Sequence, residues 1–145
     1  VYGPGQRPDL AIHKFVKNIA NDKPVVLFGD GSTARDYTYI DDTVSGIFNA
    51  LQFCLKNTGL YTTVNLGNNK PVKLKDLVDA IYTGMGKTKN IVYDAMQPGD
   101  VEITFADITK AQALFGYKPS TDLKAGIGKF MDWFMKVEKE KKISA

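Results

Sequence analysis

Apolar residues recur along this chain with two different spacings, one typical of helices and one typical of strands. The helical spacing of three and four residues occurs in four stretches, at 10–19, 44–55, 74–81 and 123–137. Short apolar or alternating runs predict strands at 25–28, 37–40, 62–66 and 91–93. Helices and strands alternate, so we predict the α/β class with a small amount of sheet.

Acidic residues and glycines indicate where these elements begin and end. Helix-capping carboxylates are predicted at Asp9, Asp41–Asp42, Asp107 and Asp122, the last with Thr121 as an alternative. We interpret the Asp41–Asp42 pair as a cap rather than as an acid/base pair. A turn at 29–32 lies between the strands at 25–28 and 37–40, and it predicts a hairpin.

Composition excludes several classes of function. A length of 145 residues suggests one domain. His13 is the only histidine and Cys54 the only cysteine, which argues against a zinc site or a Ser-His or Cys-His catalytic pair. We interpret His13 as structural and Cys54 as a small core residue. The net charge of +3 comes from dispersed lysines, so neither a nucleic-acid groove nor a membrane segment is predicted.

One glycine motif imitates a dinucleotide-binding loop. Residues 29–34 read Gly-Asp-Gly-Ser-Thr-Ala, which fits the loose pattern G-x-G-x-x-A after an apolar strand. That pattern binds a pyrophosphate only when a helix begins within it, so that the helix N-terminus faces the phosphates. Here a strand-like segment follows, and we reject the dinucleotide interpretation.

A set of short motifs instead carries a family resemblance over essentially the whole chain. In chain order they are VYGPGQRPDLA at 1–11, FGDG at 28–31, RDYTYIDD at 35–42, VNLG at 64–67, QPGDV at 97–101 and FGYKP at 115–119. With this order and spacing the chain resembles the C-terminal, substrate-binding half of extended short-chain dehydrogenase/reductases that act on nucleotide sugars. It is most similar to UDP-glucuronate 4-epimerases. UDP-glucose 4-epimerases, dTDP-glucose 4,6-dehydratases and UDP-xylose synthases are related alternatives.

Two motifs that are typical of the family are absent from this chain. The family binds NAD through T-G-x-x-G-x-x-G and reacts through Y-x-x-x-K, and neither pattern occurs here. The resemblance therefore implies that residues 1–145 form a substrate-binding portion, that the NAD-binding domain is missing, and that the chain alone is inactive. Some elements would complete a Rossmann-like domain. The implied parent is a cytoplasmic, NAD-dependent epimerase that acts at C4 of a UDP-sugar and could form a homodimer.

Two charged residues are implied to hold the nucleotide. Arg35 matches the arginine that binds the pyrophosphate, for which a planar guanidinium gives bidentate contact. Its alternative role is a surface pair with Asp36 or Asp30. Asp100 matches the carboxylate that accepts the ribose hydroxyls, and its alternative role is that of a turn residue. Gln97 stands where some relatives carry a second arginine, so no phosphate role is assigned to it.

Three further residues are implied to surround the base and the nucleotide pocket. The backbone of Phe28 matches the group that hydrogen-bonds the uracil, Leu10 matches the residue that covers the base, and Tyr37 matches a pocket-lining aromatic. Phe28 on its own would be a core residue, a role compatible with the first, and the alternative for Tyr37 is an inward-facing strand aromatic. Our own inference adds Arg7, which could recognise a hexuronate carboxylate, with a local salt bridge as its alternative.

A rival hypothesis needs no chemistry at all. The chain could be a non-catalytic binding or interaction module that uses the same pocket, or none. The sequence upstream of Val1 would discriminate the two, because the enzyme requires the glycine loop and the Y-x-x-x-K pair there.

Overall fold

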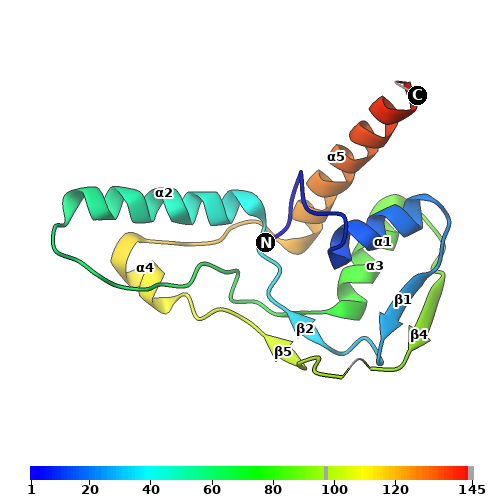
Figure 1. Ribbon diagram of the computed structural model, residues 1–145, viewed down its shortest axis with the longest axis horizontal. Coiled ribbons are helices and arrows are strands. Elements are labelled where there is room, and N and C mark those ends of the chain that lie inside the picture. The colour runs from blue at the N-terminus through cyan, green and yellow to red at the C-terminus, as the bar shows by residue number, and fades with distance from the viewer. Residues whose placement is uncertain (97, 144–145) are drawn as a thin grey trace.

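The computed structural model describes residues 1–96 and 98–143, and over these it confirms the α/β class (Figure 1). The elements in chain order are α1 (Ala11–Ala20), β1 (Val25–Phe28), β2 (Ala34–Arg35), α2 (Ile40–Lys56), β3 (Val72–Lys73), α3 (Leu74–Met85), β4 (Ile91–Asp94), β5 (Ile103–Thr104), α4 (Thr109–Phe115) and α5 (Leu123–Ile143).

The main core lies where α1, α3 and α5 meet the two-stranded sheet of β1 and β4. The sheet is parallel, with Val25 opposite Ile91 and Phe28 opposite Asp94, and α3 lies on the connection between its strands. Apolar residues at helical spacing enter this core, which includes the fully buried Val16, Leu77, Val78, Ile81 and Phe130. The periodicity at 10–19, 74–81 and 123–137 therefore predicted the buried helix faces correctly.

The predicted hairpin is wrong. β1 pairs with β4, whereas β2 lies in a second sheet with the order β3-β2-β5. The predicted strand at 37–40 is displaced to Ala34–Arg35, and Tyr39 makes only an isolated bridge with Tyr2. Between the strands the turn docks on the start of α3, where the amides of Leu74 and Lys75 donate to Thr33 and Gly31 carbonyls at 2.8 and 3.0 Å. These bonds also satisfy first-turn amides of a helix that lacks a side-chain cap.

Two predicted caps are also wrong. α1 begins after Leu10, and Asp9 pairs with Arg7 instead of capping. α2 begins after Tyr39, which places Asp41 and Asp42 inside its first turn, where the helix dipole still favours them. By contrast, the carboxylate of Asp122 accepts the amide of Ala125 at 2.8 Å, which confirms Asp122 as the cap of α5. Asp107 lies one residue before Ile108, the N-cap of α4, and its carboxylate accepts the amide of Thr109, the first residue of that helix.

Asp42 joins α2 to the start of α5. Its side chain is buried, and its carboxylate accepts the amides of Ser120 and Thr121 at 3.0 and 3.1 Å and the Ser120 hydroxyl at 3.3 Å. A buried carboxylate needs such donors to offset its desolvation. It therefore acts as a link between segments nearly eighty residues apart.

α2 and α4 form an arm that extends from the main core (Figure 1). A small cluster of Ile108, Ala111 and Tyr117 holds the arm together. The strand predicted at 62–66 does not form, because no strand of the described chain lies beside it. Cys54 is exposed rather than buried, which corrects its assignment to the core.

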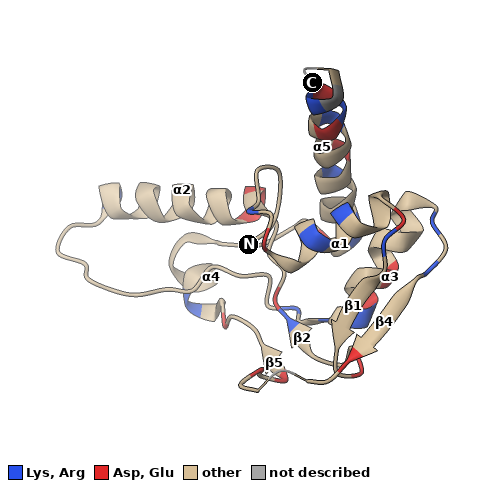
Figure 2. Cartoon of the chain, turned by 45° about the vertical axis from the view of Figure 1, so that its right-hand side comes forward, with Lys and Arg blue, Asp and Glu red and all other residues tan. Residues whose placement is uncertain are grey.

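The apolar residues of α2 point largely to solvent. They are exposed by 53–71% and comprise Val44, Ile47, Phe48, Leu51 and Leu55. Beyond the first turn, the only charged residue in α2 is Lys56, so the helix is uncharged along most of its length (Figure 2). The helical period was predicted correctly, but within this chain it does not correspond to a buried face.

Candidate nucleotide site

The short strand β2 places Arg35 on the central strand of the three-stranded sheet. β2 pairs antiparallel with β3, so that Arg35 is opposite Val72, and parallel with β5, so that Arg35 is opposite Thr104. Each ladder spans only two residue pairs. Arg35 is half-buried, and its position is set by chain segments that come from three separate parts of the sequence.

Arg35 and Asp100 form an ion pair although 65 residues separate them. The Nη2 atom of Arg35 donates to Oδ1 of Asp100 at 3.1 Å, and Nη1 donates to the Ala34 carbonyl at 2.9 Å. The exposed fractions of the two charged side chains are 29% and 39%, so both remain accessible to a solute. The structure thus brings together the two residues to which the family resemblance assigned neighbouring groups of one nucleotide.

The alternative partners proposed for Arg35 are engaged elsewhere. Asp30 accepts the Ser32 amide at 2.9 Å, and hydrogen bonds from Ser32 lower the pKa of the Asp30 carboxyl. Asp36 accepts three backbone amides. A surface pair of Arg35 with either residue is therefore not what the structure shows.

Tyr37 lies close to the Arg35 cation and beside the main core. Burial raises the pKa of the Tyr37 phenol, and the positive charge of Arg35 partly opposes that rise. The ring is half-buried against the core, so a structural role and a pocket-lining role are compatible. The phenol is neutral at ordinary pH and can donate a hydrogen bond.

Phe28 ends β1 at an unpaired edge of its sheet. The amides of Val25 and Gly29 donate to the carbonyls of Asn90 and Asp94, at 2.9 and 2.8 Å, so alternate residues of β1 face β4. By this alternation the amide and carbonyl of Phe28 point to the open edge. They are available to a planar ligand with donors and acceptors, such as a nucleobase.

Leu10 and Arg7 lie in the loop before α1. Leu10 is 36% exposed, and its amide donates to the Arg7 carbonyl at 3.3 Å. The Arg7 guanidinium pairs with Asp9 at 3.0 Å, with both side chains exposed. No hydrogen bond or ion pair among the described residues links this loop to Arg35 or Asp100. Gln97 lies outside the residues that the structure describes.

Sequence reasoning did not assign a site role to Asp36 or Gly67. Both line an open hollow of about 360 Å³ beside β2, together with Thr38 and Thr104 among others. The only sequence signal for Asp36 was its position next to Arg35. That position suggested an ion pair with Arg35 and gave no indication of a bond to remote backbone amides. The hydrogen bonds that Asp36 makes could not be read from the sequence.

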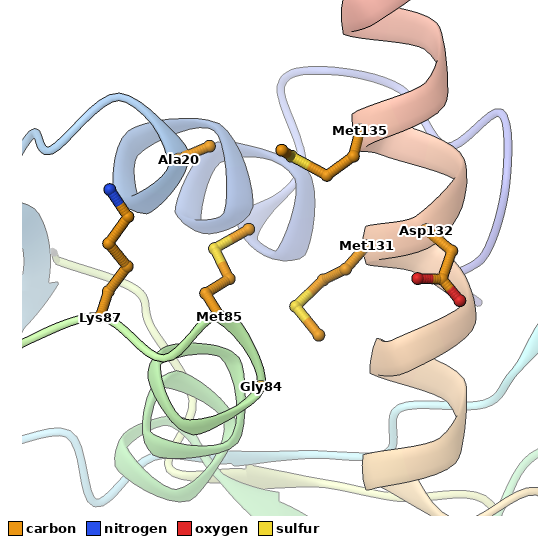
Figure 3. Close-up of a pocket in the computed structure, with 7 residues that line it drawn as sticks. All are labelled: Ala20, Gly84, Met85, Lys87, Met131, Asp132 and Met135. Carbon is orange, nitrogen blue, oxygen red and sulfur yellow. The ribbon is translucent and has the colours of Figure 1, made fainter.

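A second hollow, of about 330 Å³, lies between α1, α3 and α5 (Figure 3). Met131 and Met135 of α5 point toward Met85 of α3 across it. Ala20, Gly84, Lys87 and Asp132 complete its lining. It contains none of the residues predicted for the nucleotide, so it is a separate feature.

The described residues contain no group of three or more His, Cys, Asp or Glu side chains placed to hold a metal ion. None of the helices in that part of the chain is both long and apolar enough to cross a membrane.

Comparison with known proteins places the chain among nucleotide-sugar enzymes. Residues 1–130 match the family of GDP-mannose 4,6 dehydratase. UDP-glucuronate 4-epimerase 5 of Arabidopsis thaliana is 42% identical over 148 residues, which cover 93% of this chain and 34% of that protein.

Solved structures of epimerases have the same fold. One is UDP-glucuronic acid 4-epimerase of Bacillus cereus, in complex with UDP-glucuronic acid and NAD. The superposition covers 94% of this chain and 43% of the Bacillus cereus chain, with a TM-score of 0.86 and 34% sequence identity. Another is UDP-glucose 4-epimerase of Thermotoga maritima in complex with UDP-glucose. The superposition covers 94% of this chain and 44% of the Thermotoga maritima chain, with a TM-score of 0.85 and 28% sequence identity. The chain spans between 34% and 46% of the length of the curated relatives it matches.

Proposed function

The chain belongs to the GDP-mannose 4,6-dehydratase family of extended short-chain dehydrogenase/reductases, and from that membership we propose that it is the UDP-sugar-binding portion of an NAD-dependent epimerase. UDP-glucuronate is the substrate we favour, because relatives named for it reach 42% identity. UDP-glucose and dTDP-glucose enzymes are the alternatives.

The observation that carries this proposal is the Arg35–Asp100 pair. A UDP-sugar needs a cation for its pyrophosphate and an acceptor for the adjacent ribose hydroxyls, and these two groups lie 3.1 Å apart. A guanidinium that already donates to Asp100 through Nη2 has further N–H groups left for a phosphate oxygen. Ligand binding therefore requires Asp100 and the phosphate to share Arg35, or Asp100 to turn toward the ribose.

The remaining residues suit the other parts of the nucleotide. The open backbone edge at Phe28 offers a donor and an acceptor to the uracil, and Leu10 offers exposed apolar surface to its face. Tyr37 lies next to Arg35 and can donate from its neutral phenol. In this proposal the chain anchors the nucleotide firmly and leaves the sugar free to turn.

The chemistry at C4 of the sugar lies outside this chain in the proposal. NAD supplies the hydride chemistry when it is bound, and the Bacillus cereus relative is described in complex with it. The residues described here contain no helix that begins within the glycine motif after β1, so they offer no pyrophosphate-binding helix start at that place. We propose that the NAD-binding half contacts the exposed apolar residues of α2, because apolar contact with a second domain would remove them from water.

The decisive experiment titrates the chain with UDP and measures affinity by calorimetry and by amide chemical shifts. We expect Arg35→Ala to weaken UDP binding by about 1.5–3 kcal/mol, the usual contribution of a hydrogen bond to a charged group. This corresponds to roughly a ten- to hundred-fold rise in Kd. Arg35→Lys should recover only part of the affinity, because an ammonium keeps the charge but loses the planar fork.

Arg7→Ala is the matched control for Arg35→Ala. Arg7 is also an arginine in an ion pair, yet it lies in a different loop and pairs with Asp9. Its removal should leave the affinity for UDP unchanged. If Arg7 recognises a hexuronate, the same variant should reduce the preference for UDP-glucuronate over UDP-glucose. Unchanged UDP affinity in a folded Arg35→Ala protein would contradict the proposal for the site.

Activity measurements address the rival, non-catalytic hypothesis. The pure chain supplied with NAD should not interconvert UDP-glucuronate and its C4 epimer, because it has no Y-x-x-x-K pair. Turnover by the pure chain would contradict the proposed division of roles. Binding of UDP with no activity even when the upstream half is supplied would favour the binding module.

A further inference from the structure

Asp36, the residue after Arg35, holds three backbone amides from two distant parts of the chain. Its Oδ1 atom accepts the Asn68 amide at 2.9 Å, and its Oδ2 atom accepts the amides of Asn69 and Ala106 at 3.1 and 3.0 Å. An ionised carboxylate makes such bonds stronger than those between neutral groups. One half-buried side chain therefore ties together three segments.

These bonds extend a very short strand on both of its sides. β2 is two residues long, and it pairs with β3 on one side and β5 on the other. Asn68 and Asn69 lie in the segment that leads into β3, and Ala106 lies two residues beyond the end of β5. Ladders of two residue pairs fix register weakly, so the carboxylate adds constraint where the sheet is weakest.

The local structure is shaped to receive this carboxylate. Asn69 has a φ of 55°, which turns the backbone so that two successive amides face one anion. At Gly67 a Cβ atom would lie 2.7 Å from Oδ2 of Asp36 and 2.5 Å from the Ala106 Cβ, so no side chain fits there. The buried hydroxyl of Tyr117 donates to the Gly67 carbonyl at 3.0 Å and holds this glycine in place.

We propose that Asp36 is a positioning residue for the nucleotide site, which sets the spacing of Arg35 and Asp100 by clamping β2 to the segments on both sides. Arg35 is on β2, and Asp100 is on the segment that enters β5. The distance between Arg35 and Asp100 therefore depends on how β2 is aligned with β5. The hydrogen bond from Ala106 to Asp36 continues the contact between these two strands beyond their two residue pairs. This inference rests on the proposed function, because it names what positions that same site.

The competing role for Asp36 is direct contact with a ligand, since it lines the open hollow beside β2. Both of its oxygen atoms are committed to backbone amides, so it is poorly placed to accept a proton or a sugar hydroxyl. The geometry favours action through Arg35. A double-mutant cycle separates the two roles.

The test measures the UDP affinity of the full chain in four forms: wild type, Asp36→Asn, Arg35→Ala and the double variant. The asparagine keeps the shape of the side chain but replaces one acceptor oxygen with an NH2 group, which cannot accept an amide proton. For residues coupled through one network, we expect Asp36→Asn to raise the Kd about five-fold in wild type. It should change the Kd by less than about two-fold in the Arg35→Ala background, where its target is gone.

Asp42→Asn is the matched control. Asp42 also accepts two remote backbone amides, but it links α2 to the start of α5 and not β2 to its neighbours. It should lower the unfolding midpoint and leave the UDP affinity unchanged. If Asp36→Asn weakens UDP binding equally in both Arg35 backgrounds, or not at all, the positioning role is overturned.

A ligand-free measurement keeps this inference separate from the proposed function. NMR of the Arg35 guanidinium should show its contact with Asp100 in wild type and lose it in Asp36→Asn, with no UDP present. An unchanged guanidinium signal would overturn the inference, whereas failure of wild type to bind UDP would overturn only the proposed function. If Asp36→Asn does not fold, Asp36→Glu should give the same two results, because its additional methylene group shifts the carboxylate away from the three amides while keeping its charge.

Discussion

The main core and the α2–α4 arm use apolar residues in opposite ways. In the core, α1, α3 and α5 bury their apolar faces against one another and against β1 and β4. In the arm, a helix with equally regular spacing leaves the apolar side chains of Val44, Ile47, Phe48, Leu51 and Leu55 largely exposed. The first region buries its apolar side chains within the chain, while the second leaves a row of apolar side chains exposed to solvent.

The difference bears on where the nucleotide site lies. Arg35 is on the three-stranded sheet between the two regions and Asp100 on the segment that enters β5, whereas Phe28 ends β1 of the main core and Leu10 directly precedes α1 (Figure 1). In our proposal the spacing of Arg35 and Asp100 depends on the links that Asp36 makes, whereas the links of Asp42 join the arm to α5.

The largest expected effect compares two phenylalanines. Phe130 is fully buried in the core, and Phe48 on α2 is 58% exposed. Phe130→Ala should lower the free energy of unfolding by about 3–5 kcal/mol, because it leaves a cavity. Phe48→Ala should change it by no more than about 0.5 kcal/mol. Urea unfolding followed by circular dichroism measures both, and equal losses would mean that the arm is as well packed as the core.

The next effect concerns the link between the regions. Asp42→Ala leaves the amides of Ser120 and Thr121 without their acceptor, at a cost of about 1–3 kcal/mol. Because the link joins the arm to α5, hydrogen exchange should become faster in α2 and at the start of α5 while α3 changes less. Uniform acceleration over the whole chain would show that the two regions unfold as one unit.

A pH experiment tests the small cluster of the arm through Tyr117. Burial, together with the negative charges of Asp42 and Asp36, raises the pKa of the Tyr117 phenol to about 12. A raised pKa favours the protonated form in the folded protein, so this stabilising contribution is complete below the unfolded pKa of about 10 and is lost as the pH rises toward 12.

The variant Tyr117→Phe isolates that contribution. Between pH 10 and 12 it should lose less stability per pH unit than wild type, although below pH 10 it should be about 0.5–1.5 kcal/mol less stable, because it lacks the bond to the Gly67 carbonyl. Parallel stability curves for the two proteins above pH 10 would show that Tyr117 does not titrate as expected.

The smallest expected change in stability is for a substitution on the exposed apolar face of α2, where the binding of other molecules should change more clearly. Leu51→Lys places a charge at a side chain that is already 53% exposed, so the free energy of unfolding should change by about 0.5 kcal/mol or less. Binding of a hydrophobic dye should fall, and association with the NAD-binding half that we propose should weaken. The matched control Val26→Lys alters a residue 40% exposed on β1 and should not affect that association.

The sequence by itself determined much of the local structure. The periods at 10–19, 44–55, 74–81 and 123–137 identified the four long helices, and Asp122 correctly marked the start of the last of them. These features depend on contacts within a few residues, which the order of the amino acids contains. The family motifs likewise singled out Arg35 and Asp100 as residues of one site.

Only the tertiary structure decided which distant segments meet. The hairpin and the strand at 62–66 were wrong because a run of β-forming residues does not specify its partner, and β1 found a parallel strand more than sixty residues away. Asp42 and Asp36 looked like a helix cap and an arginine partner, yet each binds backbone amides from remote segments. A carboxylate bonds whichever donors the fold brings to it, and a strand needs another strand, so both outcomes depend on long-range contacts that local sequence does not encode.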